Sequence, residues 1–272
     1  MTGIKNFARQ RMIRIYDRAM RKSVTARYYD NSGFFNFGYW TADTKSQRAA
    51  SEALVDQLVN RLPNKTGLIL DVACGMGASS ERLARTFSPN KITGVNISEA
   101  QLAQARKRCP GSTFLVMDAT KLQFPDAHFD NVICVEAAFH FDTRDDFFRE
   151  AFRVLKPGGA LVVSDMLFKH FSDTLGQMAH VPRANHVRDI AEYRNRLAAA
   201  GFTDIDIDDA TDVCLARFRT NLAHWPLTEY RVGRLKLSRT LGMALIFRIL
   251  AAYFGFTCKT YLLVSARKRG GG

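Results

Sequence analysis

The chain has 272 residues, of which 47% are hydrophobic and 24% charged, a balance typical of a globular protein and not of a disordered or low-complexity one. This length suits one large α/β domain that carries additional elements. The formal net charge is +13, and the excess lies at the two ends: residues 1–30 hold eight Lys or Arg against two Asp, and residues 214–272 hold eleven against one Glu. The middle of the chain is therefore not basic.

The basic ends are compatible with nucleic acid, an anionic membrane, an acidic carrier protein or a phosphorylated substrate, and equally with scattered solvated charges. The first 25 residues contain no apolar run long enough for a signal sequence, which predicts a cytoplasmic protein. The five cysteines have no CxxC spacing, which argues against a zinc ribbon and a dithiol redox motif. The histidines have no ligand spacing such as HExxH, so we expect no metal.

Two helices are predicted before the first strand. Apolar residues at loosely helical spacing among Arg and Lys predict a basic amphipathic helix over residues 4–27. The aromatic stretch 28–40 follows, and apolar residues at helical spacing then predict a helix over residues 46–62. We interpret residues 1–62 as an N-terminal helical cap.

From residue 68 onward, short apolar runs alternate with helical stretches. This alternation predicts a mostly parallel sheet with helices on both faces. Seven runs have the length and composition of strands: 68–73, 91–96, 113–117, 131–135, 160–165, 203–209 and 259–266. We place the core of the fold in residues 63–213, and its last strand with a basic tail in residues 258–272.

Residues 214–257 interrupt this pattern. Within them, residues 241–256 form an apolar run of 16 residues that contains Arg248, which is short of the ~20 residues that a helix needs to cross a bilayer. We expect a buried or substrate-capping helix and interpret the insertion as a helical lid. The Arg and Lys that flank it raise the hypothesis of peripheral contact with a membrane or a lipid-like substrate.

The segment ILDVACGMGASS, residues 69–80, places Asp71 at the end of a predicted strand and Gly75 and Gly77 in the turn that follows. Glycines let the backbone approach a ligand closely, and a helix that follows offers free N–H groups. A dinucleotide site is the obvious competitor. However, the third glycine of GxGxxG is absent, and the second strand ends in Asn96 instead of Asp or Glu.

This segment resembles the first motif of class I S-adenosylmethionine-dependent methyltransferases, and three further motifs follow in order. Residues 117–119, MDA, resemble the adenine-contacting motif; residues 129–133, FDNVI, the fourth-strand motif; and residues 153–160, RVLKPGGA, the turn before the fifth strand. The resemblance covers residues 25–210 and is strongest to the small-molecule branch, which includes sugar, polyketide, sterol and tocopherol methyltransferases. It implies a Rossmann-like fold of seven strands that binds S-adenosylmethionine and releases S-adenosylhomocysteine.

The resemblance also implies roles for the residues that match these motifs. Asp71 would organise the glycine loop and bind the methionine amino group. Asp118 would accept from the adenine amino group, and the Ala119 N–H would donate to the ring. The predicted cofactor-binding residues are Tyr28, Tyr29, Asp71, Ala73, Gly75, Gly77, Asn96, Gln101, Asp118, Ala119 and Glu136.

One of these assignments departs from the common pattern, and another has an alternative interpretation. Most of the family has an acidic residue where Asn96 stands, but one branch with a Gly-x-x-x-Ser-x-x-Gln pattern resembles residues 94–101, so we assign Asn96 and Gln101 to the ribose. Tyr28 and Tyr29 resemble an aromatic element that folds over the methionine end of the cofactor. Their aromatic rings could equally only pack the N-terminal helix against the core.

Glu136 and His140 follow the fourth predicted strand, where a reactive methyl group would be presented. We predict His140 as the general base, because an imidazole with an ordinary pKa near ~6.5 is neutral at working pH and can take a hydroxyl proton. Asp165 would orient or charge-stabilise this imidazole, an arrangement that resembles sugar O-methyltransferases. Alternatively, His140 only hydrogen-bonds its loop, and Glu136 steadies a carbocation as in terpenoid C-methyltransferases.

The sequence therefore predicts an S-adenosylmethionine-dependent methyltransferase whose partner is a small, apolar, natural-product-like acceptor, methylated on oxygen. C-methylation of a prenyl or terpenoid acceptor and N-methylation of an alkaloid-type acceptor stay open, as does a homodimer. We expect no nucleic acid partner, since the chain has no recognisable RNA-binding module and no Asn-Pro-Pro-Tyr motif. The intact motifs argue against an inactive scaffold protein.

Overall fold

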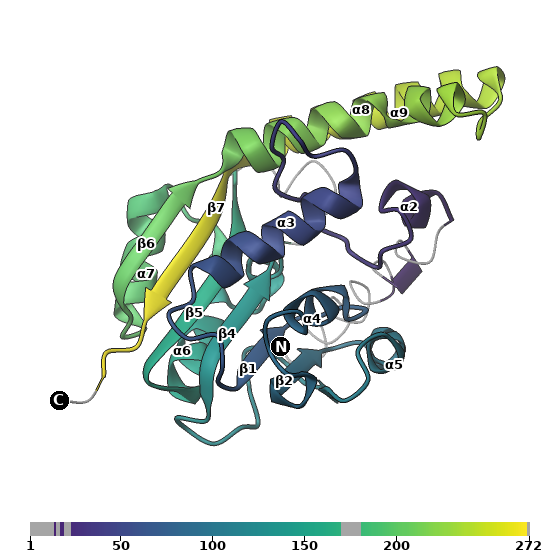
Figure 1. Ribbon diagram of the computed structural model, residues 1–272. Coiled ribbons are helices and arrows are strands. Elements are labelled where there is room, and N and C mark those ends of the chain that lie inside the picture. The colour runs from purple at the N-terminus through teal and green to yellow at the C-terminus, as the bar shows by residue number, and fades with distance from the viewer. Residues whose placement is uncertain (1–13, 15–16, 19–22, 170–180, 271–272) are drawn as a thin grey trace.

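The computed structural model describes residue 14 and residues 17–18, 23–169 and 181–270. Within these residues the strands form one sheet in the order β3-β2-β1-β4-β5-β7-β6, and only β7 runs antiparallel to its neighbours (Figure 1). The strands are β1 (Ile69–Val72), β2 (Ile92–Asn96), β3 (Thr113–Val116), β4 (Phe129–Val135), β5 (Leu155–Phe168), β6 (Thr203–Asp209) and β7 (Cys258–Arg267). The predicted Rossmann-like fold with seven, mostly parallel strands is confirmed.

Helices cover both faces of this sheet, which is why the central strands are apolar on both sides. The described α-helices are α2 (Ser23–Tyr28), α3 (Gln47–Asn60), α4 (Ala78–Leu83), α5 (Glu99–Arg108), α6 (Arg144–Val154), α7 (Ile190–Ala199), α8 (Arg217–Arg231) and α9 (Leu237–Thr257). Leu54 and Leu58 of α3 pack on one face, whereas Phe148 of α6 and Tyr193 of α7 pack on the other. The predicted helix 46–62 corresponds to α3, and the predicted helix 4–27 lies mostly outside the described residues.

Side-chain caps define where several of these helices begin. The Ser46 hydroxyl accepts from the Ala49 N–H at the start of α3, and the Ser98 hydroxyl accepts from the Gln101 N–H at the start of α5. α6 begins with a capping box between Thr143 and Asp146. Short helical turns complete the fold: η1 (Pro89–Lys91), η2 (Ala138–His140), η4 (Arg183–Asn185) and the π-helical η5 (Thr211–Ala216) that leads into α8.

The order of the strands predicts where a ligand binds. β1 lies between β2 and β4, so the chain moves outward in one direction from β1 and then returns to continue in the other. In open α/β sheets, ligands bind beyond the carboxyl ends of the strands at such a point of reversal. The glycine turn after β1 and the segments after β2 and β4 therefore meet at one edge.

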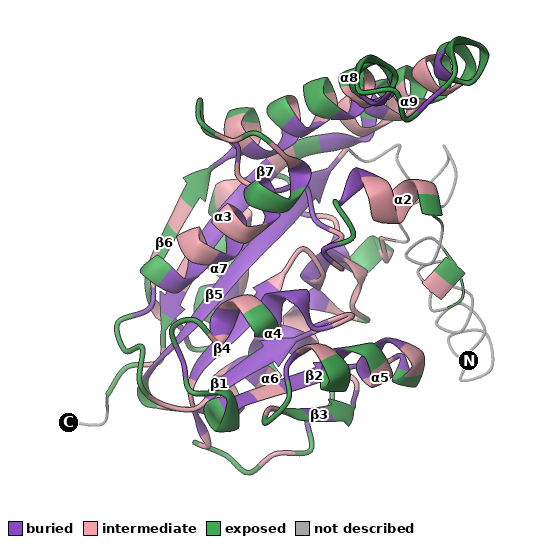
Figure 2. Cartoon of the chain, turned by 45° about the vertical axis from the view of Figure 1, so that its right-hand side comes forward, coloured by how far each residue is buried: buried purple, intermediate pink, exposed green. Residues whose placement is uncertain are grey.

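The insertion forms a long hairpin of α8 and α9 that projects from the body (Figures 1 and 2). The expectation of a buried helix is wrong for α9: Leu241, Leu245 and Ile249 are each more than 60% exposed. The helix is also longer than expected, with 21 residues, and it is the one described helix that is long and apolar enough to cross a membrane by length and composition. An apolar sequence around the whole helix suggests burial, but α9 packs through one face only.

Candidate active site

The turn after β1 adopts the backbone conformation for which glycine is suited. Gly75 and Gly77 have φ values of +55° and +79°, and Ala73 reaches +58°, a region that residues with a Cβ rarely adopt. A Cβ on Gly77 would lie 2.7 Å from both Cα and Cβ of Ala105 in α5. We expected both glycines to allow close approach of a ligand; Gly77 also allows close packing of two helices.

Replacing Gly77 by alanine is therefore expected to lower the free energy of unfolding by about 1–3 kcal/mol, because strain from a positive φ adds to overpacking. Gly158 is a matched control, since its φ is +82° but nothing lies within 4 Å of the position that a Cβ would take. Urea unfolding of both alanine variants separates the two costs. Equal losses for Gly77→Ala and Gly158→Ala would show that packing against Ala105 contributes nothing.

Asp71 connects β1 to the first turn of α4. The side chain is 1% exposed, and its Oδ2 accepts from the hydroxyls of Ser79 at 2.7 Å and Ser80 at 2.6 Å. Burial raises the pKa of Asp71 to about 6, although the two hydroxyls oppose the rise. These contacts hold the glycine turn in place, and binding of the methionine amino group stays a prediction.

The two residues assigned to the ribose lie side by side at the end of β2. Asn96 Nδ2 donates to Gln101 Oε1 at 2.8 Å, and both residues are less than 10% exposed. Gln101 Nε2 donates in turn to Oδ1 of Asp17 at 2.6 Å, and the same oxygen accepts from the Ser98 hydroxyl at 3.0 Å. The N-terminal segment thus brings a carboxylate to the strand end that lacks its own acidic residue.

The segment predicted to contact adenine, residues 117–119, follows β3 directly. The Met117 N–H donates to the Asn96 carbonyl at 3.0 Å, which places this turn beside the end of β2. Asp118 Oδ1 accepts from the Thr120 N–H at 2.9 Å and the Thr120 hydroxyl at 2.8 Å, so its carboxylate is fixed within an Asx turn. Ala119 is 6% exposed.

The two predicted tyrosines lie in different surroundings. Tyr29 lines a cavity of about 130 Å³ together with Met76, which stands between the two glycines of the turn. Tyr28 instead packs edge-on against Phe218 and Trp225 at centroid distances of 6.0 and 5.6 Å. Its hydroxyl is buried and has no hydrogen-bond partner among the described residues. Tyr29 therefore shares a cavity with the glycine turn, and Tyr28, whose ring lies edge-on to that of Tyr29 at 5.1 Å, belongs to an aromatic cluster.

Glu136 follows β4 with a positive φ of +49°, a conformation that is strained for a residue with a Cβ and that is common at functional sites. Its Oε1 accepts from the Phe37 N–H at 2.7 Å and from the Tyr261 hydroxyl at 2.5 Å. Phe37 in turn stacks on Phe218 at a centroid distance of 4.1 Å. Burial in these aromatic surroundings raises the pKa of Glu136 to about 8.

This raised pKa makes stability depend on pH. An unfolded glutamate ionises near pH 4.5, so between pH 4.5 and about 8 the folded protein binds more protons than the unfolded one, and stability falls as pH rises. Glu136→Gln is expected to remove this part of the fall, measured as the difference in Tm from wild type across that range. Glu99→Gln is the control and should leave the profile parallel to that of wild type in this range, because Arg106 lowers the pKa of exposed Glu99 and its stability effect is lost only below pH 4.5. A wild-type profile parallel to that of Glu136→Gln would contradict the raised pKa.

The structure corrects the partner predicted for Asp165. Its carboxylate is fully buried and accepts from Arg144 Nε at 2.8 Å and from the Tyr193 hydroxyl at 2.8 Å. The Met166 N–H donates to its second oxygen at 2.8 Å. None of the hydrogen bonds that the described residues make to Asp165 comes from His140. The carboxylate of Asp165 instead pairs with the buried guanidinium of Arg144. A buried charge destabilises the fold unless an opposite charge lies beside it.

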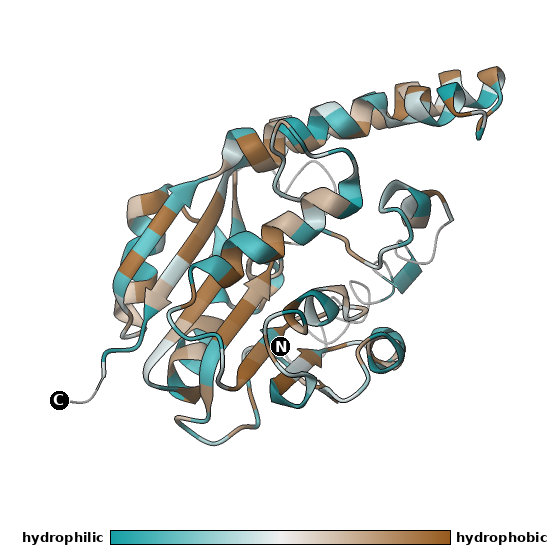
Figure 3. Cartoon of the chain, in the orientation of Figure 1, coloured by the Kyte–Doolittle hydropathy of each residue, from teal (hydrophilic) through white to brown (hydrophobic). Residues whose placement is uncertain are grey.

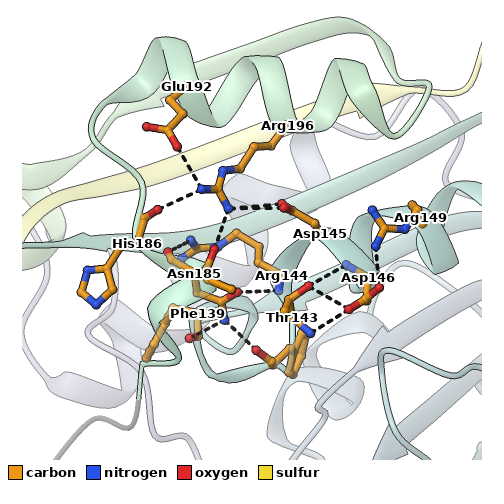
Figure 4. Close-up of polar contacts among 12 residues, drawn as sticks. Phe139, Thr143, Arg144, Asp145, Asp146, Arg149, Asn185, His186, Glu192 and Arg196 are labelled. Atoms are coloured by element: carbon orange, nitrogen blue, oxygen red, sulfur yellow. Dashed lines mark hydrogen bonds and ion pairs between the residues drawn. The ribbon is translucent and has the colours of Figure 1, made fainter. Parts of the chain in front are cut away.

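His140 lies in η2 and is partly exposed, with its ring 4.1 Å from that of Phe139. Asn185 holds this loop, because its Nδ2 donates to the carbonyls of Phe139 at 3.0 Å and Phe141 at 2.6 Å (Figure 4). The Oδ1 of Asn185 accepts from the Arg144 N–H at 2.7 Å, and its carbonyl accepts from the Arg144 guanidinium. The buried ion pair and the loop that carries His140 therefore form one network.

The hydrogen-bond acceptors at this edge fit S-adenosylmethionine. The cofactor presents an ammonium group, two ribose hydroxyls and an adenine amino group as donors. The chain offers carboxylates from Asp71, Asp17 and Asp118 and the amides of Asn96 and Gln101 as acceptors. Within the part of the chain that the structure describes, no group of three His, Cys, Asp or Glu could hold a metal ion.

The sequence analysis did not identify several residues of the site. Asp17 lies in a basic helix without a motif, and Phe37 and Tyr261 meet Glu136 from 99 and 125 residues away. Arg144 and Asn185 lie in segments that match no motif. Both have polar neighbours, with Arg144 between Thr143 and Asp145, so the sequence carries no sign that these two side chains are buried.

Comparison with known proteins is consistent with this geometry. A family model described as a methyltransferase domain matches residues 70–163. The 27-O-demethylrifamycin SV methyltransferase of Amycolatopsis mediterranei is 32% identical over 188 residues, which are 64% of this chain and 68% of that protein. The O-methyltransferase cnsE of Penicillium expansum is 31% identical over 191 residues, which are 65% of this chain and 68% of that protein.

Solved structures share the fold over most of the chain. The [4+2]-cyclase SpnF has a TM-score of 0.66 and 26% identity, covering 90% of this chain and 94% of that one. Geranyl diphosphate C-methyltransferase from Streptomyces coelicolor, solved with S-adenosylhomocysteine, has a TM-score of 0.68 and 16% identity, covering 93% and 96%. With the motifs, the hydrogen-bond acceptors and the relatives in agreement, this chain belongs to the small-molecule branch of the class I S-adenosylmethionine-dependent methyltransferases.

Proposed function

We propose that this enzyme methylates a hydroxyl group of a small, largely apolar acceptor, with His140 as the general base. The observation that carries the proposal is the partly exposed imidazole of His140, held by Asn185 in the loop after β4. The names of two similar proteins support the choice of oxygen. One is the 27-O-demethylrifamycin SV methyltransferase described above. The other is the erythromycin 3''-O-methyltransferase of Saccharopolyspora erythraea, which is 31% identical over 66% of this chain and 65% of its own length.

The residues divide the chemistry between positioning and proton transfer. S-adenosylmethionine supplies an activated methyl group on a sulfonium, which leaves as a thioether. Neutral His140 would take the hydroxyl proton as the acceptor oxygen bonds to the methyl carbon. Asn185 keeps the imidazole in place through the two loop carbonyls, and alignment of the reacting atoms contributes much of the rate.

Glu136 favours a second candidate, C-methylation of an alkene. Its carboxyl lies against Phe37 and Tyr261. The aromatic rings would stabilise a carbocation left after methyl transfer, and so would the carboxylate above about pH 8, where Glu136 is ionised. Geranyl diphosphate C-methyltransferase shares the fold, but its 16% identity supports no more than that. NMR of the methylated product distinguishes a methyl bonded to oxygen from one bonded to carbon.

The first test is binding of S-adenosylhomocysteine by calorimetry. We expect micromolar affinity for wild type and loss of binding for Asp118→Ala. Asp206→Ala is the matched control, since Asp206 is an exposed aspartate on β6, at the opposite edge of the sheet from β3, and should bind as wild type does. Absence of binding to wild type would contradict the cofactor site.

The second test identifies the acceptor. Wild type is incubated with methyl-labelled S-adenosylmethionine and fractions of a metabolite extract, and labelled products are analysed by mass spectrometry and NMR. Label in an O-methyl group of an apolar product supports the proposal. Label on carbon or nitrogen overturns O-methylation, and label on RNA overturns the small-molecule acceptor.

A further inference from the structure

Within the part of the chain that the structure describes, one face of α9 carries large apolar side chains that stay exposed. The other face is packed: Trp225 of α8 stacks on Phe247 at 5.3 Å, and Arg219 Nε donates to the Ala251 carbonyl at 2.7 Å. The exposed face carries what we name the apolar stripe, formed by Leu241, Leu245, Ile246 and Ile249. These side chains are 61–63% exposed, and Figure 3 shows hydrophobic residues alternating with hydrophilic ones along the hairpin.

The stripe is continuous and has cationic borders. At about 100° per residue, Leu241, Leu245 and Ile249 fall within an arc of about 80°, and Ile246 widens this arc to about 140°. Arg248 lies beyond one edge of this arc and Arg239 beyond the other, and both are exposed. Arginine side chains in these positions can extend past an apolar surface and keep their guanidinium groups in water.

The hairpin carries a net positive charge. Residues 217–257 contain seven Arg or Lys and a single acidic residue, Glu229. Glu229 is 4% exposed and lies 3.1 Å from Arg234 and 3.9 Å from Arg27, so it offers no carboxylate to a partner surface. A partner of complementary charge is therefore anionic.

We propose that the hairpin docks on the surface of an anionic lipid bilayer, with α9 lying in the interface and the apolar stripe among the acyl chains. An apolar stripe bordered by cations is the pattern by which interfacial helices bind anionic lipid. A second copy of this chain is disfavoured as the occupant, because two hairpins would bring like charges together without carboxylates between them.

The hairpin lies on the surface and does not span the bilayer. α9 carries Arg248 near its middle, and its partner α8 carries Arg219, Asn221 and His224, all of which would enter the hydrocarbon core with it. The carboxyl end of α9 also continues directly into β7, which lies inside the sheet. The length of α9 therefore gives a long contact along the membrane surface instead of a transmembrane span.

Docking would place the active site next to the lipid. The base of the hairpin packs on the aromatic cluster around Glu136, through Phe218 against Phe37 at 4.1 Å and against Tyr28 at 6.0 Å. A lipophilic acceptor dissolved in the bilayer could reach the site along this surface. The statement about the acceptor rests on the proposed function, whereas the docking itself does not.

Vesicle flotation tests the docking on the full chain. Wild type is expected to float with vesicles of phosphatidylglycerol and phosphatidylcholine in equal parts, and not with phosphatidylcholine alone, and to be released at high ionic strength. The Leu241→Ser/Leu245→Ser/Ile249→Ser and Arg239→Glu/Arg248→Glu variants are each expected to lower the vesicle partition coefficient about tenfold or more. The matched control, Arg85→Glu/Lys107→Glu, makes the same charge change at exposed positions beside α4 and in α5 and should float as wild type does.

Three outcomes overturn the proposal. The first is that wild type stays in solution with anionic vesicles at low salt. The second is that the control variant loses as much binding as the hairpin variants. The third is that light scattering shows a dimer in solution that the serine variant dissociates. All variants should keep their affinity for S-adenosylhomocysteine, which shows that the fold and cofactor site are intact. Flotation without any such affinity would contradict the proposed function and leave the docking standing.

Discussion

Arg144→Met is expected to lower the free energy of unfolding by about 3–5 kcal/mol, because it leaves the carboxylate of Asp165 buried without a counter-charge. Both side chains are fully buried, and Arg144 also donates to the Met166 carbonyl at 3.2 Å and to the Asn185 carbonyl. Methionine roughly matches the apolar part of the side chain, so loss of volume contributes little. Urea unfolding of the purified variant measures the change.

Arg149→Met is the matched control in the same helix. Arg149 pairs with Asp146 at 2.5 Å on the exposed side of α6, and exposed ion pairs of this kind contribute about 0–1 kcal/mol in general. Arg144→Met/Asp165→Asn should recover part of the loss, since it removes the unpaired charge. Equal unfolding energies for Arg144→Met and Arg149→Met would show that the buried pair does not stabilise the fold.

His140→Gln is expected to lower kcat by about 10²–10⁴ with little change in the KM of the acceptor, since a general base acts in the transition state and not in binding. Glutamine keeps a polar side chain of similar reach but cannot take a proton. The ascending limb of the pH–rate profile should disappear with it. Steady-state rates with the acceptor found by the labelling experiment measure both effects.

His128→Gln is the control for this substitution. His128 is partly exposed as well, but it precedes β4 and lies at the opposite end of that strand from His140. Its replacement should leave kcat unchanged. If His140→Gln retains full activity while Glu136→Gln loses it, the proton-transfer role of His140 is wrong and Glu136 carries the reaction.

The fold could be predicted closely from local patterns. Each predicted strand overlaps an observed one, and the bounds of β6 agree at both ends. Short apolar runs between helical stretches are a local property, so no knowledge of distant contacts is needed to find them. The glycine turn after β1 was likewise found from the sequence, because its backbone requires residues without a Cβ at Gly75 and Gly77.

The hairpin shows where such patterns mislead. The apolar run around Arg248 predicts burial, but its environment depends on whether another element covers it. α8 covers one face of α9, and among the described residues the apolar stripe has no cover. Hydropathy reports the preference of a segment for an apolar environment, and it does not report what provides that environment.

The sequence by itself determined the class of fold, the cofactor and the stretch of chain that binds it, because these depend on spacing within short segments. Only the tertiary structure decided which polar groups meet. Asp165 pairs with Arg144 instead of His140, Glu136 lies against Phe37 and Tyr261, and Gln101 donates to Asp17. The physical reason is that hydrogen bonds and ion pairs require distances near ~3 Å between their atoms. Those distances depend on how whole helices and strands pack, and the spacing of residues along the chain does not determine them.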